Sequence, residues 1–401
     1  MASDITTYPC IVRSVTYFVP EGDVGSAGWE GAMQEAAAFL ATARGSLEQE
    51  GITVQTLRVA TDILTRVESV EEALRKARVV QAAAAASGIS FVSYGAFSNA
   101  RLLEEGLATK LLTTPGGDAY TCCTFRWQPG MGVEEARSAA RAIFSLGRAT
   151  GDAGPFHFAL TFAEEGFQTP FFPAACATRP GFAIATENSA QYAAALASAG
   201  EGGPAGVTPA LRAAMAAGLR GAQACAVKLA TATHVPYLGI DTSINPGLEG
   251  PSLAGAFESV GLGPFGGPGT LAVAERVTAA VQSLSGIDTT GYCGLMLPLA
   301  EDTGLAAASR ALSVQTLLFY SAVCGCGLDT VPVPGVSDET PAGEAARLVA
   351  AAAALVLDIA GMAARLGKPL TCRLLPVAGG KAGQATAWDS PYLVPGTLLS
   401  L

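Results

Sequence analysis

Alternating apolar and polar positions predict ten β-strands in this chain, and segments with helical spacing fill most of the gaps between them. Residues 11–19, for example, alternate and are rich in β-branched and aromatic side chains, as is typical of a strand. The predicted strands are residues 11–19, 52–59, 89–94, 119–126, 155–162, 182–186, 235–241, 294–299, 328–333 and 371–377. Helices between successive strands imply crossover connections, and hence largely parallel pairing.

The helical segments divide the chain evenly and reveal no boundary between two self-sufficient halves. The predicted helices are residues 28–50, 67–87, 99–106, 133–149, 190–199, 209–230, 252–260, 271–284, 303–323 and 341–366. We therefore predict a single large α/β domain over residues 1–401. Periodicity alone does not choose between an open doubly wound sheet and a closed barrel.

The stretch 313–341 is the most unusual in the chain, because a Cys-Gly-Cys-Gly turn links a helix to an apolar strand. Glycines at alternate positions let this segment run close to other backbone, and its apolar character predicts burial. Cys324 and Cys326 are candidate catalytic thiols. A reactive thiol needs a cationic neighbour or a helix N-terminus, and none is adjacent in sequence. Two small buried residues are the simpler interpretation.

Composition narrows the classes of protein to consider. The formal charge of −10 argues against a nucleic-acid or acidic-membrane partner, because both require a basic face. The nine cysteines are odd in number and lie mostly in apolar segments, which favours reduced, buried thiols. The first residues lack the pattern of a secretory signal, and the most apolar window, 348–357, is too short for a bilayer. We expect a cytoplasmic protein.

Acidic and amide side chains follow several predicted strands. Glu301 and Asp302 follow residues 294–299, whereas Asp241 ends another strand and precedes Asn245 and Glu249. Together with Asp329 they form a set of polar groups at strand ends, where parallel α/β proteins bind ligands. Such a set could hold a divalent cation or orient an amine. The alternative for each residue alone is a solvated side chain or a helix cap.

Three basic residues complete the candidate ligand-binding set. Arg13 and Arg373 lie within predicted strands, where a charge must face water, a partner or a lumen. Lys381 follows the last strand. These three could bind an anionic substrate or pair with the acids. We predict no metal centre, because His157 and His234 are the only histidines and neither belongs to a spaced motif. The chain also lacks a P-loop, a G-x-S-x-G elbow, an H-E-x-x-H motif and a kinase signature.

Several blocks of the sequence, in order, resemble one known family. They are RSVTYFV, DTSINPGLEGPSLAGAFESVGL, FGGPGTLAVAERV, LMLPLAEDTGLAAAS, VCGCGLDTVPVPGVSDET and LPVAGGKAGQ. They are similar to blocks of the family catalogued as domain of unknown function 711, also called uncharacterised protein family 0210. The resemblance implies a fold like that of pyruvate-formate-lyase-type glycyl-radical enzymes, a ten-stranded α/β barrel with an inserted loop at its centre.

The same resemblance places individual residues. Cys324 lies where the family pattern usually has a cysteine, whereas Cys326 departs from it. Glu301, Asp302, Asp329 and Lys381 fall on motif positions to which the family attaches no established role.

We expect a pocket at the barrel mouth that binds a small polar metabolite. It would be lined by some of Asp241, Asn245, Glu301, Asp302, Asp329 and Lys381. Glycyl-radical chemistry is not expected, because the tail glycines lie in no Arg-x-x-Gly-Tyr context. The alternative is a non-catalytic regulatory or structural binding module on the same fold. The sequence identifies no cofactor and leaves a homo-oligomer open.

Overall fold

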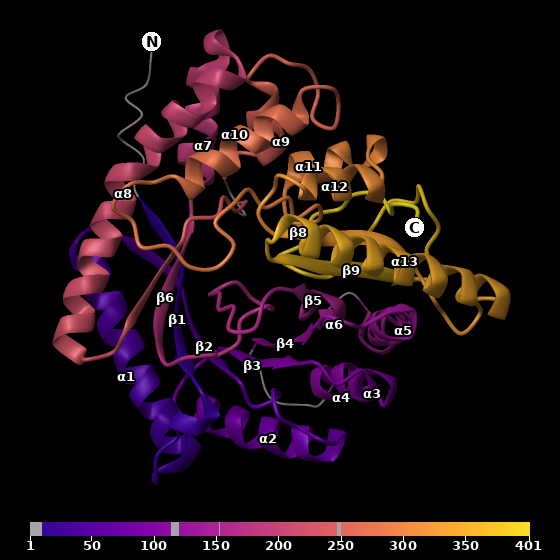
Figure 1. Cartoon of the computed structure of the whole chain (residues 1–401), viewed down its shortest axis with the longest axis horizontal. Helices are drawn as coiled ribbons and strands as arrows, with labels where there is room; N and C mark the ends of the chain where they lie inside the picture. Colours follow the sequence, from indigo (N-terminus) through magenta and orange to yellow (C-terminus); the bar gives the residue numbers. More distant parts are fainter. Residues whose placement is uncertain (1–9, 114–119, 152, 247–249) are drawn as a thin grey trace.

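A mixed β-sheet runs through the computed structural model, which describes residues 10–113, 120–151, 153–246 and 250–401 (Figure 1). Its nine strands in the described chain follow the order β7-β6-β1-β2-β3-β4-β5-β9-β8. The strands are β1 (Ile11–Val19), β2 (Thr53–Thr61), β3 (Phe91–Phe97), β4 (Tyr120–Arg126), β5 (Phe158–Phe162), β6 (Gly181–Glu187), β7 (Tyr237–Asp241), β8 (Gly327–Gly335) and β9 (Leu370–Ala378). The sequence prediction of an α/β domain built on one sheet is confirmed.

Strand direction changes on both flanks of the sheet. Strands β1 to β5 are mutually parallel, whereas β6 pairs antiparallel with β1 and β9 pairs antiparallel with β5. The outermost strands β7 and β8 are parallel to their neighbours β6 and β9. One edge of the sheet therefore carries the amino ends of β1 to β5 beside the carboxyl ends of β6 to β9.

The sheet is not closed into a ten-stranded barrel, so that sequence expectation was wrong. The predicted strand at 294–299 makes only isolated bridges, which pair Leu295 with Ile244 and Pro298 with Asp329. Gly294 and Pro298 interrupt this segment, and proline cannot donate to a ladder. The segment thus touches both flanks of the sheet without forming a continuous strand between them.

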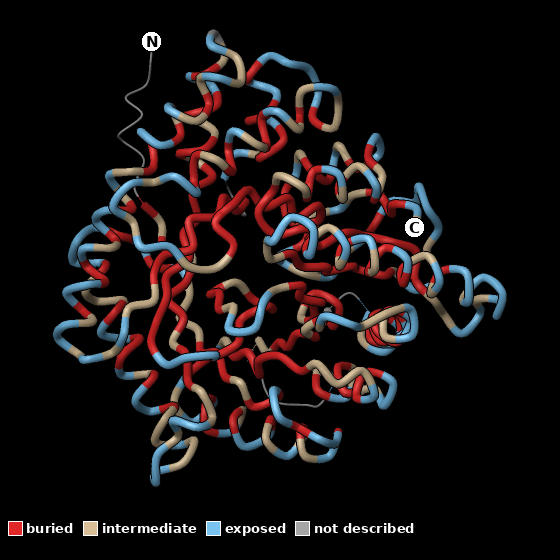
Figure 2. Tube along the Cα trace, in the orientation of Figure 1, coloured by how far each residue is buried: buried red, intermediate tan, exposed pale blue. Residues whose placement is uncertain are grey.

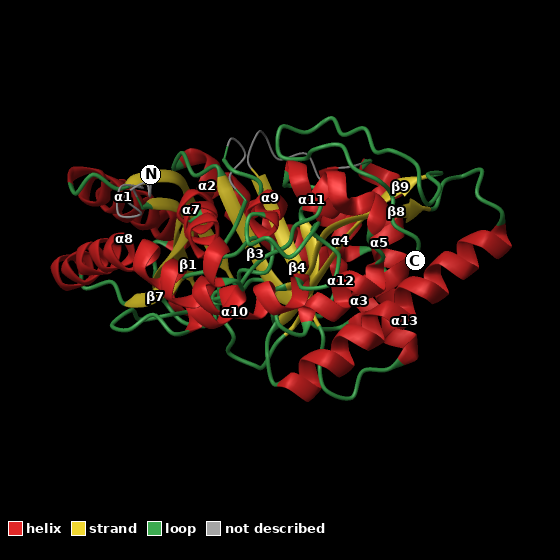
Figure 3. Cartoon of the chain, turned by 90° about the horizontal axis from the view of Figure 1, so that it is seen from above, coloured by secondary structure: helices red, strands yellow, loops and turns green. Residues whose placement is uncertain are grey.

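Helices cover the outer side of the curved sheet (Figures 1 and 3). They are α1 (Gly28–Gln49), α2 (Val70–Ala86), α3 (Ala100–Glu104), α4 (Leu107–Thr113), α5 (Val133–Thr150), α6 (Ala153–Phe156), α7 (Ser189–Ala199), α8 (Pro204–Thr233), α9 (Leu253–Glu258), α10 (Thr270–Gln282), α11 (Thr303–Ala308), α12 (Val314–Ser321) and α13 (Ala342–Leu366), with 3₁₀ turns η2 (Glu21–Asp23), η3 (Gly200–Gly202) and η4 (Ser309–Ala311). The main hydrophobic core lies between this layer and the sheet.

The helix predicted over residues 303–323 is broken in two. Helix α11 ends at Ala308, and the chain passes through η4 and an extended Leu312 before α12 begins. The side chain of Ser313 accepts a hydrogen bond from the Thr316 amide at 3.1 Å, which caps α12. A serine that caps a new helix competes with continuation of the preceding one, and periodicity does not register this competition.

Of the described helices, α13 alone has the length and apolar composition of a membrane span, with a mean hydropathy of 1.8 over its most apolar stretch. One face of α13 packs against α5 and β9, and Leu348, Val356 and Ile359 are buried there. A single helix of this kind is weak evidence for a membrane protein, because core helices share its composition.

A long connection between β5 and β6, residues 163–180, folds against the inner side of the sheet. Residues 168–170 and 172–177 within it are buried (Figure 2). Phe172 packs with Phe18 and Cys122 of the sheet, whereas Ala174 packs with Tyr292. A buried loop needs partners for its backbone, and Ser93 Oγ donates to the Ala175 carbonyl at 2.6 Å. The sequence analysis did not foresee this inner layer.

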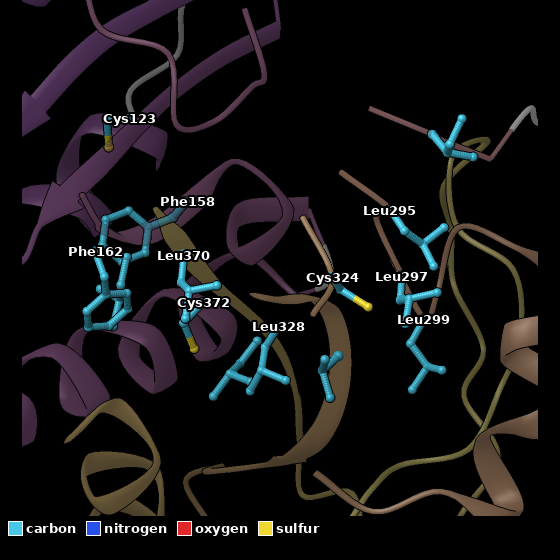
Figure 4. Close-up of a cluster of buried hydrophobic side chains, with 14 of the residues drawn as sticks. Cys123, Phe158, Phe162, Leu295, Leu297, Leu299, Cys324, Leu328, Leu370 and Cys372 are labelled. Atoms are coloured by element: carbon cyan, nitrogen blue, oxygen red, sulfur yellow. The ribbon is translucent and has the colours of Figure 1, made fainter. Parts of the chain in front are cut away.

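The cysteine-bearing turn before β8 is buried, as the sequence predicted. It also runs close to other backbone, because the Gly325 amide donates to the Leu295 carbonyl at 2.6 Å. A Cβ at Gly294 would lie 2.3 Å from Gly325 Cα, so both positions require glycine. Figure 4 shows Cys324 near Leu295 and Leu297 in the hydrophobic core.

Candidate functional site

A cavity of ≈ 630 Å³ opens on the inner side of the sheet. It lies towards the end of the sheet where the amino ends of β1 to β5 lie beside the carboxyl ends of β6 to β9. Strands β1 to β4 and β6 to β9, the inner loop 163–180 and the segment 296–301 supply most of its walls. It is lined by Ile11, Arg13, Ser14, Gln55, Thr56, Arg58, Phe91, Tyr120, Phe156, Pro170, Phe171, Phe172, Ala185, Glu187, Ser189, Ala190, Asp241, Asn245, Pro246, Gly250, Pro251, Met296, Pro298, Glu301, Asp329, Arg373 and Tyr392.

A buried arginine joins two carboxylates at one side of the cavity. Arg373 on β9 donates from Nε to Asp329 Oδ1 at 2.6 Å and from Nη2 to Glu301 Oε1 at 2.7 Å. The guanidinium also lies 4.8 Å from the centre of the Phe156 ring. Burial alone would lower the pKa of Arg373, but the charge of Asp329 and then that of Glu301 raise it, so the arginine stays cationic.

Arg13 makes this group of charges neutral as a whole. Its Nη2 lies 3.9 Å from Glu301 Oε2, and its Nη1 donates to the Pro246 carbonyl at 2.8 Å. Burial raises the pKa of Glu301, whereas the charge of Arg373 opposes that rise. The charges of two arginines and two carboxylates therefore balance. We call Arg13, Arg373, Glu301 and Asp329 together the buried ion-pair group.

The sequence analysis missed Arg58, a third arginine at the cavity. Arg58 lies on β2 between two aromatic rings, 5.5 Å from the centre of Phe91 and 5.1 Å from that of Phe172. Its Nε donates to Thr56 Oγ1 at 2.9 Å, but no carboxylate of the described residues pairs with it. Burial, followed by the charge of Arg13, lowers the pKa of Arg58 to about 10. An anion in the cavity would relieve both effects.

Ser14 supplies an unsatisfied hydroxyl beside Arg58. Ser14 on β1 is opposite Thr56 on β2, and Thr16 is opposite Arg58. The hydroxyls of Ser14 and Thr16 are buried and have no hydrogen-bond partner among the described residues. A buried hydroxyl without a partner costs stability, and Ser14 lines the cavity where a ligand or water would satisfy it.

Glu187, at the carboxyl end of β6, is a further charged residue of the cavity, and like Asp241 it lies at the end of a predicted strand. Gln55 Nε2 donates to its Oε2 at 2.5 Å, and Ser189 Oγ donates to its Oε1 at 3.0 Å. Both donors are neutral, and no cation of the described chain pairs with this buried carboxylate. Its position at a strand end was a usable signal in the sequence.

Asp241 and Asn245 line the cavity but also hold the local backbone. Asp241 accepts hydrogen bonds from the amides of Ser243, Tyr292 and Cys293, each at 3.1 Å. Burial raises the pKa of Asp241, whereas the hydrogen bond from the Ser243 hydroxyl opposes that rise. Asn245 Nδ2 donates to the Thr186 carbonyl at 3.1 Å. Asp241 thus fixes the turn after residue 289, and little of its bonding capacity is left for a ligand.

Two sequence candidates lie away from the cavity. Asp302 caps α11 by accepting from the Leu305 amide at 2.8 Å, and it also accepts from the Leu253 amide at 2.7 Å. It therefore ties α9 to α11, which matches the alternative of a helix cap. Lys381 is exposed in the turn after β9, where its amide donates to Gln384 Oε1 at 3.1 Å. Glu249 lies outside the described residues.

Neither candidate thiol lines the cavity. Burial raises the pKa of Cys324 to about 12, against which the charge of Lys368 acts, and burial also raises the pKa of Cys326 well above its ordinary value. Lys368 instead caps the end of α12, because its Nζ donates to the carbonyls of Ser321 at 3.0 Å and Cys324. Both thiols lie among packing groups in this structure, and their burial favours the protonated form over the thiolate.

The chemistry available in the cavity is that of oxygen and guanidinium groups. Its lining contains no cysteine or histidine, and within the described residues no three His, Cys, Asp or Glu side chains gather as metal ligands. Aromatic rings form one wall, and arginine, serine and amide groups provide donors at others. This combination of apolar walls and a few converging polar groups is characteristic of small-molecule sites.

Comparison with known proteins identifies relatives of unknown activity. Over 155 residues the chain is 36% identical to a UPF0210 protein of Pyrobaculum islandicum. The aligned region covers 37% of this chain and 32% of the relative. A UPF0210 protein of Methanopyrus kandleri is 33% identical over 161 residues, which are 39% of this chain and 34% of the relative. One of Oleidesulfovibrio alaskensis is 32% identical over 160 residues, which are 38% of this chain and 33% of the relative. The matched region thus spans about a third of the length of these curated relatives.

The family described as "Uncharacterised ACR (DUF711)" matches residues 4–389, which include every residue of the cavity wall except Tyr392. The match extends over nearly the whole chain. The protein therefore belongs to the DUF711 family of uncharacterised proteins.

Proposed function

We propose that this protein binds a small organic anion in the cavity, with Arg58 as its principal ligand. The observation that carries the proposal is the position of Arg58, half-buried between Phe91 and Phe172 and in an ion pair with no carboxylate of the described chain. An arginine in such a setting favours an anion from outside the chain, because a carboxylate or phosphate binds its guanidinium in a bidentate manner. The orphan hydroxyl of Ser14 supports the same position.

The proposal favours binding over covalent catalysis. The cavity wall supplies no thiol or imidazole, so nucleophile–base pairs of the Ser-His or Cys-His kind are missing from it. One observation supports an enzyme: burial raises the pKa of Glu301, and the residue lines the cavity. A proton-transfer reaction on the bound anion, with Glu301 as the base, is therefore the second candidate function.

We also propose that no glycyl-radical chemistry takes place. Cys324 and Cys326 are absent from the cavity wall, as are the tail glycines Gly379, Gly380, Gly383 and Gly396. We further propose a cytoplasmic protein without nucleic-acid or membrane partners, for which the nine free, buried cysteines are the main support. Anaerobic incubation with a radical-generating activase, followed by electron paramagnetic resonance, tests the absence of glycyl-radical chemistry. A glycine-centred doublet would overturn that proposal.

Isothermal titration with inorganic phosphate, succinate and hexanoate tests the anion site. We expect at least one of these probes to bind the wild-type protein, and Arg58→Gln to weaken its binding by about tenfold or more. Arg78→Gln, an exposed arginine on α2, is the matched control and should bind like the wild type. Equal affinities of the wild type and Arg58→Gln for every probe would contradict the proposal.

A further inference from the structure

The charges of the cavity do not all pair with one another. Within the buried ion-pair group, Arg373 bonds to Glu301 and Asp329, and Arg13 approaches Glu301. Asp241 is held by backbone amides. In the described part of the chain, this leaves one cation, Arg58, and one carboxylate, Glu187, each without a partner of opposite charge. The cavity thus offers two separate sites of opposite sign.

Glu187 has the properties of a site for a cation. It is 8% exposed and faces the cavity, and the two side chains that donate to it, Gln55 and Ser189, carry no charge. A carboxylate accepts up to about four hydrogen bonds, so both oxygens keep free lone pairs. An ammonium group of a ligand would supply both the missing charge and further donors.

The two charged sites lie far apart on the sheet. Along β1, Glu187 is opposite Ile11, whereas Arg58 is opposite Thr16. Five residues of strand span roughly 16 Å, and β6 and β2 flank β1 on opposite sides, roughly 5 Å away each. The two side chains shorten this separation, because Glu187 bonds to Gln55 on β2 and Arg58 turns back towards Thr56.

Among the described residues, the wall between the two sites carries no charge apart from Arg13, which is already paired, and it mixes apolar groups with the uncharged polar groups of Ser14, Gln55 and Thr56. Ala185 on β6 is opposite Ser14, about midway along the register, and Ile11, Met296 and Pro298 also line the cavity. Such a surface fits an aliphatic or similarly apolar linker rather than further charged groups.

We propose that the ligand is an elongated zwitterion, such as an ω-amino acid, whose ammonium group binds Glu187 and whose acidic group binds Arg58. This inference rests on the proposed function, because it takes the anion site at Arg58 as given. An α-amino acid, whose two charged groups sit on one carbon, reaches only one of the two sites. A monoanion of the same length leaves Glu187 buried without a cation.

Three probes of equal carbon number separate these cases: 6-aminohexanoate, its isomer 2-aminohexanoate, and hexanoate. We expect titration calorimetry with the wild-type protein to show about tenfold tighter binding of 6-aminohexanoate than of the other two. Glu187→Gln should remove this preference without weakening hexanoate, whereas Arg58→Gln should weaken all three probes. Glu71→Gln, an exposed glutamate on α2, serves as the matched control.

The outcomes distinguish the two proposals. Equal binding of 6-aminohexanoate and hexanoate, with both weakened by Arg58→Gln, would overturn the zwitterion but leave the anion site standing. Binding that is indifferent to Arg58→Gln, or no binding of any probe at millimolar concentration, would overturn both. The comparison of three probes on the wild-type protein needs no variant, so it decides the inference even if Glu187→Gln fails to fold.

Discussion

The Nε atom of Arg373 lies 2.6 Å from Oδ1 of Asp329, and both side chains are almost fully buried, with exposed fractions of 3% and 1%. Burying a charge is costly unless a partner of opposite charge comes with it. Each residue therefore depends on the other, because the loss of either one leaves a buried charge without its partner. This pair anchors one wall of the cavity to the first halves of two neighbouring strands.

Arg373→Met should destabilise the protein by about 3–5 kcal/mol, because it leaves Asp329 and Glu301 buried without their cation. Urea unfolding followed by circular dichroism measures the change. Arg148→Met is the matched control, since Arg148 and Asp338 form an exposed arginine–aspartate pair at 3.1 Å. It should cost less than about 1 kcal/mol. Equal losses in the two variants would mean that the burial of Arg373 carries no special cost.

Lys368→Met should destabilise the protein by about 1–3 kcal/mol. Lys368 Nζ donates to the carbonyls of Ser321 at 3.0 Å and Ala322 at 3.4 Å, and to that of Cys324, so its removal leaves the end of α12 without donors. Thermal unfolding measures the loss. Lys228→Met, where the lysine side chain is 75% exposed, should change the stability little. A larger loss in the Lys228 variant would contradict this role of Lys368.

Much of the fold could be predicted from the sequence because its signals are local. Nine of the ten predicted strands correspond to strands of the sheet, since alternation and β-branched residues act within a few positions. Strand order and direction depend on contacts between distant segments, and local patterns carry no information on them. The segment 294–299 shows the limit: its apolar residues do pair, but only through isolated bridges on two flanks.

The candidate site was only partly predictable for the same reason. The sequence candidates were sought at the ends of predicted strands, and Asp241, Asn245, Glu301 and Asp329 do line the cavity. The reversal of direction at β6 and β9 also brings in residues near the amino ends of β1 to β4. Arg58 lies within the predicted strand 52–59 and carries the same signal that singled out Arg13 and Arg373, but it was not among the sequence candidates.

The buried thiols should make the protein less stable in alkali. Burial raises the pKa of Cys122, Cys324 and Cys372 to about 12, from the ordinary value of 9.0. The unfolded chain then loses these protons first, so the stability that the neutral thiols contribute is complete below pH 9 and is lost as the pH rises towards 12. Urea unfolding at increasing pH should show this fall, with a smaller slope in Cys324→Ala.

A reactivity measurement checks the same thiols independently. At pH 8 the folded protein should react slowly with a thiol reagent such as dithionitrobenzoate, whereas the chain in guanidinium should expose all nine thiols. Rapid modification of Cys324 in the folded protein, identified by mass spectrometry, would contradict the protonated, buried state.

Gly291 should tolerate alanine far less well than Gly286, although the two have nearly the same backbone angle, with φ of 78° and 73°. A Cβ at Gly291 would lie 2.3 Å from Asp241 Oδ2, whereas a Cβ at Gly286 meets nothing within 4 Å. Gly286→Ala therefore measures the conformational cost alone, about 1–2 kcal/mol. Gly291→Ala adds displacement of the Asp241 carboxylate from the amides of Tyr292 and Cys293, at least about 2 kcal/mol more. Equal unfolding free energies for the two variants would show that the Asp241 turn accommodates a side chain, and that the cavity wall at Asp241 is not rigid.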